Sequence, residues 1–191
     1  MIRKNRRSIR LKEYDYSVPG EYFITICTKD RVHLFGNIDN DRMHESQLGK
    51  IVRDCWVEIP KHFPNVELDE FVVMPNHVHG IIGINPVGVQ YIEPLPNRYQ
   101  HIIPGSVGSI IRSFKSAVTR WCTKNGFKDF RWQRNYFEHI IRDDKSLDRI
   151  REYIASNPEQ WHHDRENIQQ EAPDKFDEWL FSAGKQSITR S

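Results

Sequence analysis

The strongest constraint on the fold is a pair of short apolar segments, 71–74 and 77–82, separated by only two residues. Both segments are rich in the β-branched and aromatic residues that are typical of strands. The intervening Pro75 and Asn76 favour a turn and are unfavourable within a strand ladder. Two strands joined this closely run antiparallel, so the sequence predicts a β-hairpin.

Strand-like and helix-like segments lie on both sides of this hairpin. Residues 22–28 predict a first strand, and the spacing of apolar residues predicts helices over about 40–59 and from Ser106 to Asn125. Residues 130–141 predict a fourth strand, and Ser146 is expected to cap a last helix that ends near Asn157. This βαββαβ order plus a helix predicts an α+β protein of ferredoxin-like architecture. We expect an antiparallel sheet with two helices on one face and the other face free for a site.

Composition excludes several classes of protein. The mean hydropathy is −0.69, and no apolar run approaches the roughly 18 residues that a membrane span requires. The basic start leads into no apolar stretch, so we expect no secretory signal and a cytoplasmic location. Cys27, Cys55 and Cys122 have no metal-ligand spacing and lie among apolar neighbours, which favours reduced core cysteines.

The formal net charge of +2 is unevenly distributed along the 191 residues. We expect a basic N-terminal arm over 1–18, one domain over 19–160 with a proline-rich loop at about 85–105, and an acidic tail over 161–191. The arm suits a phosphate backbone, although charge alone is equally compatible with a solvated terminus. The basic residues that we assign to DNA binding in this arm are Arg3, Lys4, Arg6 and Arg7.

Two histidines in the second strand of the hairpin are the first candidates for chemistry. Alternate side chains of a strand share a face, so His77 and His79 point to one side while Val78 enters the core. Two imidazoles at this spacing can bind one metal ion, but a divalent ion needs further ligands. Taken alone, such a pair is more typical of two exposed or hydrogen-bonded histidines.

Tyr153 and Asn157 are the second candidates, because residues four apart on a helix project from the same face. The Asn157 side-chain oxygen could be a third metal ligand. Pro158 disfavours the αR conformation at Asn157, so a capping role at the helix end is the alternative. A tyrosine at helical spacing is, taken alone, more often a core residue.

Together these motifs resemble the REP-associated tyrosine transposases, which are relatives of the single-tyrosine HUH transposases. The resemblance spans roughly residues 22–161. It rests on Met74-Pro75-Asn76-His77-Val78-His79-Gly80, Trp132-Gln133-Arg134, Glu138-His139-Ile140-Ile141-Arg142 and Tyr153-Ile154-Ala155-Ser156-Asn157-Pro158.

The resemblance implies a metal-dependent endonuclease and strand transferase that acts on single-stranded or hairpin DNA. His77 and His79 match the family's histidine pair, Tyr153 its nucleophile, and Asn157 its polar third ligand, with Mg²⁺ or Mn²⁺ as the cofactor. Trp132, Gln133 and Arg134 match the family's tryptophan-glutamine motif, and we assign them and the neighbouring Arg131 to DNA binding. The wider superfamily includes dimers with exchanged helices, so a homodimer is compatible with the resemblance, although no unmatched apolar stripe requires one.

Three other functions are compatible with the same pattern. A non-catalytic nucleic-acid-binding module can share the βαββαβ order, because RNA-recognition domains stack bases on the open sheet face. A phosphodiesterase that activates water would release free ends, and it usually recruits carboxylates for a second metal. Another HUH enzyme, such as a relaxase or replication initiator, is the third, but the short chain and single candidate tyrosine favour a transposase. A core tryptophan is likewise the alternative to a DNA contact at Trp132.

Overall fold

The first strand lies inside the sheet, with a neighbour on each side. The computed structural model describes residues 18–86, 104–170, 175–176 and 178–180. Its elements are β1 (Gly20–Cys27), the 3₁₀ turn η1 (Lys29–Arg31), β2 (Gly36–Asp39), β3 (Arg42–Glu45), α1 (Gln47–Val57), α2 (Ile59–His62), β4 (Val66–Val73), β5 (His77–Ile84), α3 (Val107–Lys124), β6 (Phe137–Ile141) and α4 (Asp144–Ser156). The main sheet has the order β4-β5-β1-β6 and every pairing in it is antiparallel. This confirms the predicted ferredoxin-like α+β fold.

The predicted hairpin is formed by β4 and β5, which are joined through Met74, Pro75 and Asn76. The Met74 backbone N–H donates to the His77 carbonyl oxygen at 2.8 Å and closes the turn. On the other side of β5, Thr25 and Cys27 of β1 pair with His79 and His77. This register places both histidines on an inner strand of the sheet, between β4 and β1.

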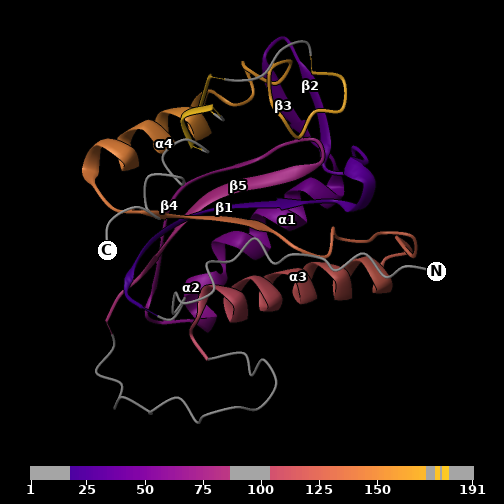
Figure 1. The fold of residues 1–191 in the computed structure, drawn as a ribbon. Coiled ribbons are helices and arrows are strands. Elements are labelled where there is room, and N and C mark those ends of the chain that lie inside the picture. Colours follow the sequence, from indigo (N-terminus) through magenta and orange to yellow (C-terminus); the bar gives the residue numbers. More distant parts are fainter. Residues whose placement is uncertain (1–17, 87–103, 171–174, 177, 181–191) are drawn as a thin grey trace, which may run out of the picture.

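One face of the sheet is covered by α1 and α3 (Figure 1). The Ser106 hydroxyl caps α3 by accepting from the Ser109 backbone N–H, as predicted. Tyr22, Ile24 and Ile26 of β1 and Val78 of β5 point into this layer and are fully buried. The larger of the two apolar cores therefore lies between these helices and the sheet.

The opposite face carries α4, which lies across the sheet from α1 and α3 (Figure 1). Phe23 and Ile81 form a second, smaller core there with Tyr153 of α4 and with Phe176 and Leu180 of the tail. This face is therefore partly covered, whereas we expected it to be free. Phe176 and Leu180 of the predicted tail therefore pack against the domain.

A small hairpin of β2 and β3 replaces the first part of the helix predicted over 40–59. Asn40 and Asp41 both have positive φ, at 49° and 59°, which is the signature of a type I′ turn between two strands. The helix itself begins at Gln47, where the Ser46 hydroxyl accepts from the Gly49 backbone N–H. The helix therefore begins later than predicted, although the apolar spacing from Leu48 onward does follow one helical face.

Three local predictions near the end of the domain were wrong. The fourth strand covers only 137–141, and Trp132 joins the sheet through a single isolated bridge to Thr28. Helix α4 is capped by Asp143, whose carboxylate accepts from the Ser146 backbone N–H, so Ser146 lies inside the helix. Asn157 ends α4 with αR angles of −57° and −38° despite the following proline.

None of the described helices is long and apolar enough to cross a membrane. The basic residues Arg3, Lys4, Arg6 and Arg7, and most of the proline-rich loop, lie outside the described residues.

Candidate active site

His77 and His79 lie side by side on β5 and face the α4 side of the sheet. Their ring centroids are 4.3 Å apart, and both side chains are buried. Val78 points to the opposite face and packs in the core formed with α1 and α3. The strand alternation therefore separates the two histidine side chains from the core side chain between them, as the sequence predicted.

Asn76 fixes the orientation and tautomer of His77. The Asn76 Nδ2 donates to the carbonyl oxygens of Arg31 at 3.1 Å and Glu166 at 2.8 Å. Its Oδ1 therefore accepts from His77 Nδ1, at 2.8 Å. A proton on Nδ1 leaves Nε2 of the neutral ring with a free lone pair, which is the form that binds a metal ion. His79 is held similarly, since its Nδ1 lies 2.9 Å from the Thr25 hydroxyl.

The Tyr153 side chain reaches the histidines from α4. Its hydroxyl lies 3.3 Å from His79 Nε2 and donates to Asp164 Oδ2 at 3.2 Å. The ring stacks on Phe176 with a centroid distance of 3.7 Å and an interplanar angle of 6°. Phe23 contacts the ring edge-on from the sheet below. The hydroxyl is thus held at the histidine pair by packing on both sides of the ring.

Asp164 is the carboxylate of the site, and it was not among the predicted site residues. Its Oδ2 lies 3.5 Å from His79 Nε2 and 3.8 Å from His77 Nε2. The same oxygen accepts from Asn157 Nδ2 at 2.8 Å, and Oδ1 accepts from the Glu166 backbone N–H at 2.6 Å. Asn157 therefore lies at the site, and its amide is anchored by this carboxylate.

Burial and charge set the protonation states of these groups. Desolvation lowers the pKa of His77 to about 3, against a raising effect of the Asp164 carboxylate, so His77 is neutral at pH 7. Burial works against the charged form of Asp164, but His77, His79 and the hydrogen bond from Asn157 outweigh it and lower the pKa of this carboxyl. The site thus holds one anion beside neutral His77.

Glu166 ties the segment after α4 to the end of β1. Its Oε2 accepts from Arg31 Nε at 2.7 Å and from the Cys27 thiol at 3.3 Å. Burial raises the pKa of Cys27, and the Glu166 charge raises it further, so the thiol stays protonated. This network holds the backbone around Asp164 against the histidines, and both acidic residues lie beyond residue 160, where we expected the domain to end.

The donors present fit a divalent metal ion. Among the described residues, His77, His79 and Asp164 offer ligand atoms that all lie within 4.8 Å of one another. His77 Nε2 and Asn157 Oδ1 are buried and form no hydrogen bond with any described group. Unpaired buried polar atoms are costly, and a metal ion would satisfy both. This group could therefore bind a metal ion.

Two proteins of Haemophilus influenzae are similar in sequence to this chain. An uncharacterized protein of Haemophilus influenzae is 49% identical over 166 residues, which cover 84% of this chain and 92% of that protein. A candidate REP-associated tyrosine transposase of the same organism is 26% identical over 147 residues, or 75% of this chain and 73% of that protein. The chain resembles the REP-associated tyrosine transposases.

The solved structure of a REP-associated tyrosine transposase bound to a REP hairpin has the same fold as this chain. The TM-score is 0.55 and the identity is 24%, with 79% of this chain and 74% of that chain covered. No protein-family model matches the chain. At this level of identity the likeness shows a shared fold.

The structure brings four predicted site residues together and leaves another group apart. His77, His79, Tyr153 and Asn157 converge on Asp164, as described above. The predicted DNA contacts 131–134 instead surround the bridge between Trp132 and Thr28, just after β1. The Trp132 ring is half-buried against Phe35, Phe114 and Phe130, and its Nε1 donates to the Lys115 carbonyl oxygen at 3.1 Å.

The neighbours of Trp132 differ in exposure. Gln133 donates its backbone N–H to the Cys27 carbonyl oxygen. Arg131 and Arg134 are exposed, and Arg131 donates to the carbonyl oxygens of Lys128 and Phe130. Trp132 thus has a packing role, and DNA contacts of this segment stay a prediction.

Proposed function

We propose that this protein is a metal-dependent single-stranded DNA endonuclease and strand transferase that acts on hairpin or palindromic DNA. The observation that carries the proposal is the position of the Tyr153 hydroxyl, 3.3 Å from His79 Nε2 and 3.2 Å from Asp164 Oδ2. A buried tyrosine with no chemical role does not need to meet a cluster of metal-ligating groups. The relationship to REP-associated tyrosine transposases supports the same assignment.

His77, His79 and Asp164 would hold the metal ion, with the Asn157 side-chain oxygen as a fourth ligand. Imidazole nitrogens suit Mn²⁺ better than Mg²⁺, while carboxylate and amide oxygens suit both. The bound ion would polarise the scissile phosphate and stabilise charge that develops on its oxygens. The protein's own contribution is to keep His77 neutral and to fix the orientation of both imidazoles through Asn76 and Thr25.

Tyr153 would be the nucleophile. Its oxygen forms a bond to the phosphorus while the bond from phosphorus to the 3′ oxygen breaks, which leaves a 5′-phosphotyrosine and a free 3′-OH. The phenol loses one proton and the departing 3′ oxygen gains one, so the step is balanced. The phosphodiester energy is retained on the enzyme, and a 3′-OH can therefore reverse the step and rejoin DNA without ATP.

The shape of the site favours a flexible strand as substrate. The histidines are buried between the sheet and α4, and the Tyr153 ring is only 8% exposed. A regular duplex would hold its phosphates outside such a site, whereas a single strand can bend toward the tyrosine. We therefore propose that the cleaved strand is single-stranded, next to a hairpin of the kind bound by the REP-associated tyrosine transposase of known structure.

A covalent adduct assay on an SDS gel tests this function. Labelled single-stranded DNA with hairpins from the gene's flanks and a panel of unrelated hairpins is incubated with protein in Mn²⁺, Mg²⁺ or EDTA. We expect a labelled protein band that depends on metal and is lost in Tyr153→Phe. Tyr22→Phe is the matched control, because it removes a hydroxyl that bonds the Val18 carbonyl oxygen, far from the histidines in the sheet register. An adduct of undiminished yield in Tyr153→Phe would remove Tyr153 as the nucleophile.

A further inference from the structure

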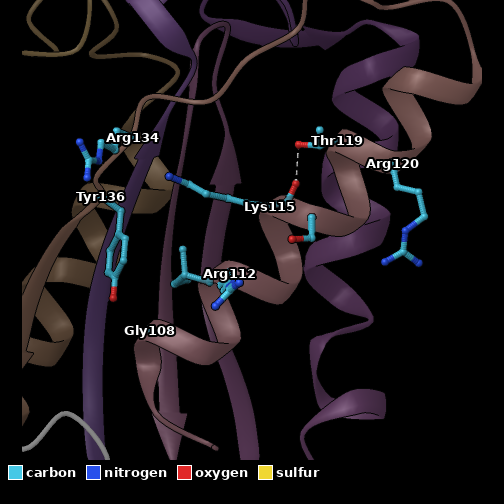
Figure 2. Close-up of a pocket in the computed structure, with 9 residues that line it drawn as sticks. Gly108, Arg112, Lys115, Thr119, Arg120, Arg134 and Tyr136 are labelled. Carbon is cyan, nitrogen blue, oxygen red and sulfur yellow. Dashed lines mark hydrogen bonds between the residues drawn. The ribbon is translucent and has the colours of Figure 1, made fainter. Parts of the chain in front are cut away.

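A groove lies between α3 and the segment that precedes β6, and the candidate active site does not use it. It encloses about 480 Å³. Figure 2 shows Lys115 extending from α3 toward Arg134 and Tyr136, with Arg112 one turn earlier on the helix. The residues that line the groove are Gly108, Ile111, Arg112, Lys115, Ser116, Thr119, Arg120, Arg134 and Tyr136.

The charge of this groove has one sign. Four of the lining residues are cationic and none is acidic. Arg112, Arg120 and Arg134 are exposed, and none of them forms an ion pair with a described residue. Some arginines elsewhere on the described surface do meet carboxylates, as in the pairs of Arg53 with Glu45 at 2.9 Å and of Arg151 with Asp69 at 2.6 Å. The groove is therefore a site where positive charge lacks a partner within the described protein.

Lys115 holds the two sides of the groove together. Its Nζ donates to the carbonyl oxygens of Gln133 at 2.8 Å and Asn135 at 3.3 Å. The same ammonium lies 6.0 Å from the centre of the Tyr136 ring and 5.9 Å from that of Trp132. Burial lowers the pKa of Lys115 to about 8, so the floor of the groove still carries a charge at neutral pH. The groove is thus a fixed feature of the fold.

The spacing of the cations matches a nucleic acid strand. Arg112 and Arg120 are eight residues apart on one helix, which corresponds to about 12 Å along its axis. A stacked DNA strand carries one phosphate per roughly 3.4 Å, so this length spans three or four phosphates. Ser116 and Thr119 add hydroxyl groups between the two arginines, and Tyr136 adds an aromatic ring on which a base can stack.

We propose that this groove binds the sugar-phosphate backbone of the DNA that enters the active site. The inference deepens the proposed function, because it assumes that DNA is the substrate. Helix α3 and the histidines lie on opposite faces of the sheet, and β6 is the edge strand beside which the groove opens. DNA that occupies both sites must therefore pass around the β6 edge, with Arg134 and Tyr136 as its contacts there.

A binding experiment with charge-matched variants tests the groove. One variant combines Arg112→Gln, Arg120→Gln and Arg134→Gln. The control combines Arg42→Gln, Lys50→Gln and Lys61→Gln, which removes the same charge from exposed positions outside the groove. The probe is a fluorescent DNA hairpin with a single-stranded extension, and Kd is measured by anisotropy in EDTA over a range of salt concentrations.

We expect the groove variant to bind at least tenfold more weakly than the control at about 0.15 M salt. The slope of its log Kd against log salt should also be smaller by roughly 2.1 to 2.7, since each of the three lost phosphate contacts removes roughly 0.7 to 0.9. The control should stay within threefold of wild type. A groove variant that binds within threefold of the control, with an unchanged slope, would overturn the proposal.

The adduct assay separates failure of this inference from failure of the proposed function. If wild type forms the adduct and both triple variants bind DNA alike, the groove is not a DNA site and the nuclease assignment stands. If only the groove variant loses binding and no protein forms an adduct with any metal, the groove is a DNA site and the catalytic assignment fails. Wild type that binds none of the hairpins overturns both.

Discussion

Gly80 determines how closely the histidine strand approaches α1, and replacing it tests the packing behind the site. It follows His79 on β5, and its Cα faces the indole of Trp56. A Cβ at this position would overlap Trp56 Cζ2 and would lie 3.0 Å from both Trp56 Cε2 and Phe71 Cβ. Trp56 cannot retreat easily, because it is fully buried and packs edge-on against Phe114 at 5.3 Å.

The size of the effect follows from this overlap. Extra atoms in a well-packed core cost about 1–3 kcal/mol, and we expect Gly80→Ala at the upper end because the obstacle is a rigid ring. A loss of about 3 kcal/mol lowers Tm by roughly 6–12 °C in a domain of this size. Because β5 must shift to relieve the contact, the neighbouring His79 would move relative to Tyr153.

Gly83→Ala is the matched control on the same strand. A Cβ there meets nothing closer than the Glu67 carbonyl oxygen at 3.7 Å, which is an ordinary contact. Thermal unfolding followed by circular dichroism should give a Tm within about 3 °C of wild type for this variant. Adding Trp56→Leu to Gly80→Ala should cost less than the sum of the two single changes, since the overlap is then gone. Equal Tm values for the two alanine variants would refute the reasoning.

Three further predictions concern the site and its helix. Mn²⁺ at a hundred times its Kd should raise the free energy of unfolding of the wild type by about 2.7 kcal/mol. Melting curves of Asp164→Asn with and without Mn²⁺ should show a much smaller rise, and an equal rise would exclude Asp164 as a ligand. His77 binds a proton in the unfolded chain below pH 6.5 but in the folded chain only near pH 3, so stability should fall over that interval as pH drops, by up to about 1.4 kcal/mol per pH unit. Urea titrations should show a flatter pH dependence in His77→Gln, and an identical slope would contradict the assigned pKa. Asp143→Ala should cost about 1 kcal/mol of stability in the same titration and Ser146→Ala less, because Asp143 is the cap; the reverse order would contradict this.

The parts of the site that follow a strong local period were predictable from sequence. A strand places alternate residues on one face, so the spacing of His77 and His79 is enough to pair them. Helical spacing does the same for Tyr153 and Asn157. The same alternation predicts that Val78, between the two histidines, points to the opposite face and packs in the main core.

Asp164 could not be found in this way, because it lies in a segment of turns without a repeating pattern. Its position depends on long-range contacts, above all the bonds from Glu166 to Arg31 and Cys27. The only signal in the sequence is a pair of acids around Arg165, which resembles an ordinary solvated tail. The β2–β3 hairpin was missed for a different reason, since its strands have four residues each and the Asn40–Asp41 turn signal was not used.

The central position of β1 has a consequence for the nascent chain on the ribosome. This strand is made first, yet its two partners, β5 and β6, begin at His77 and Phe137. At about 5–20 residues per second, the β6 side stays open for roughly 5 to 20 seconds after β1 has been synthesised. Residues 22–27 are mainly apolar and are buried in the folded protein. During that interval the strand is therefore an unpaired, aggregation-prone edge. Synthesis of this protein therefore includes a period in which β1 can pair with strands of other chains.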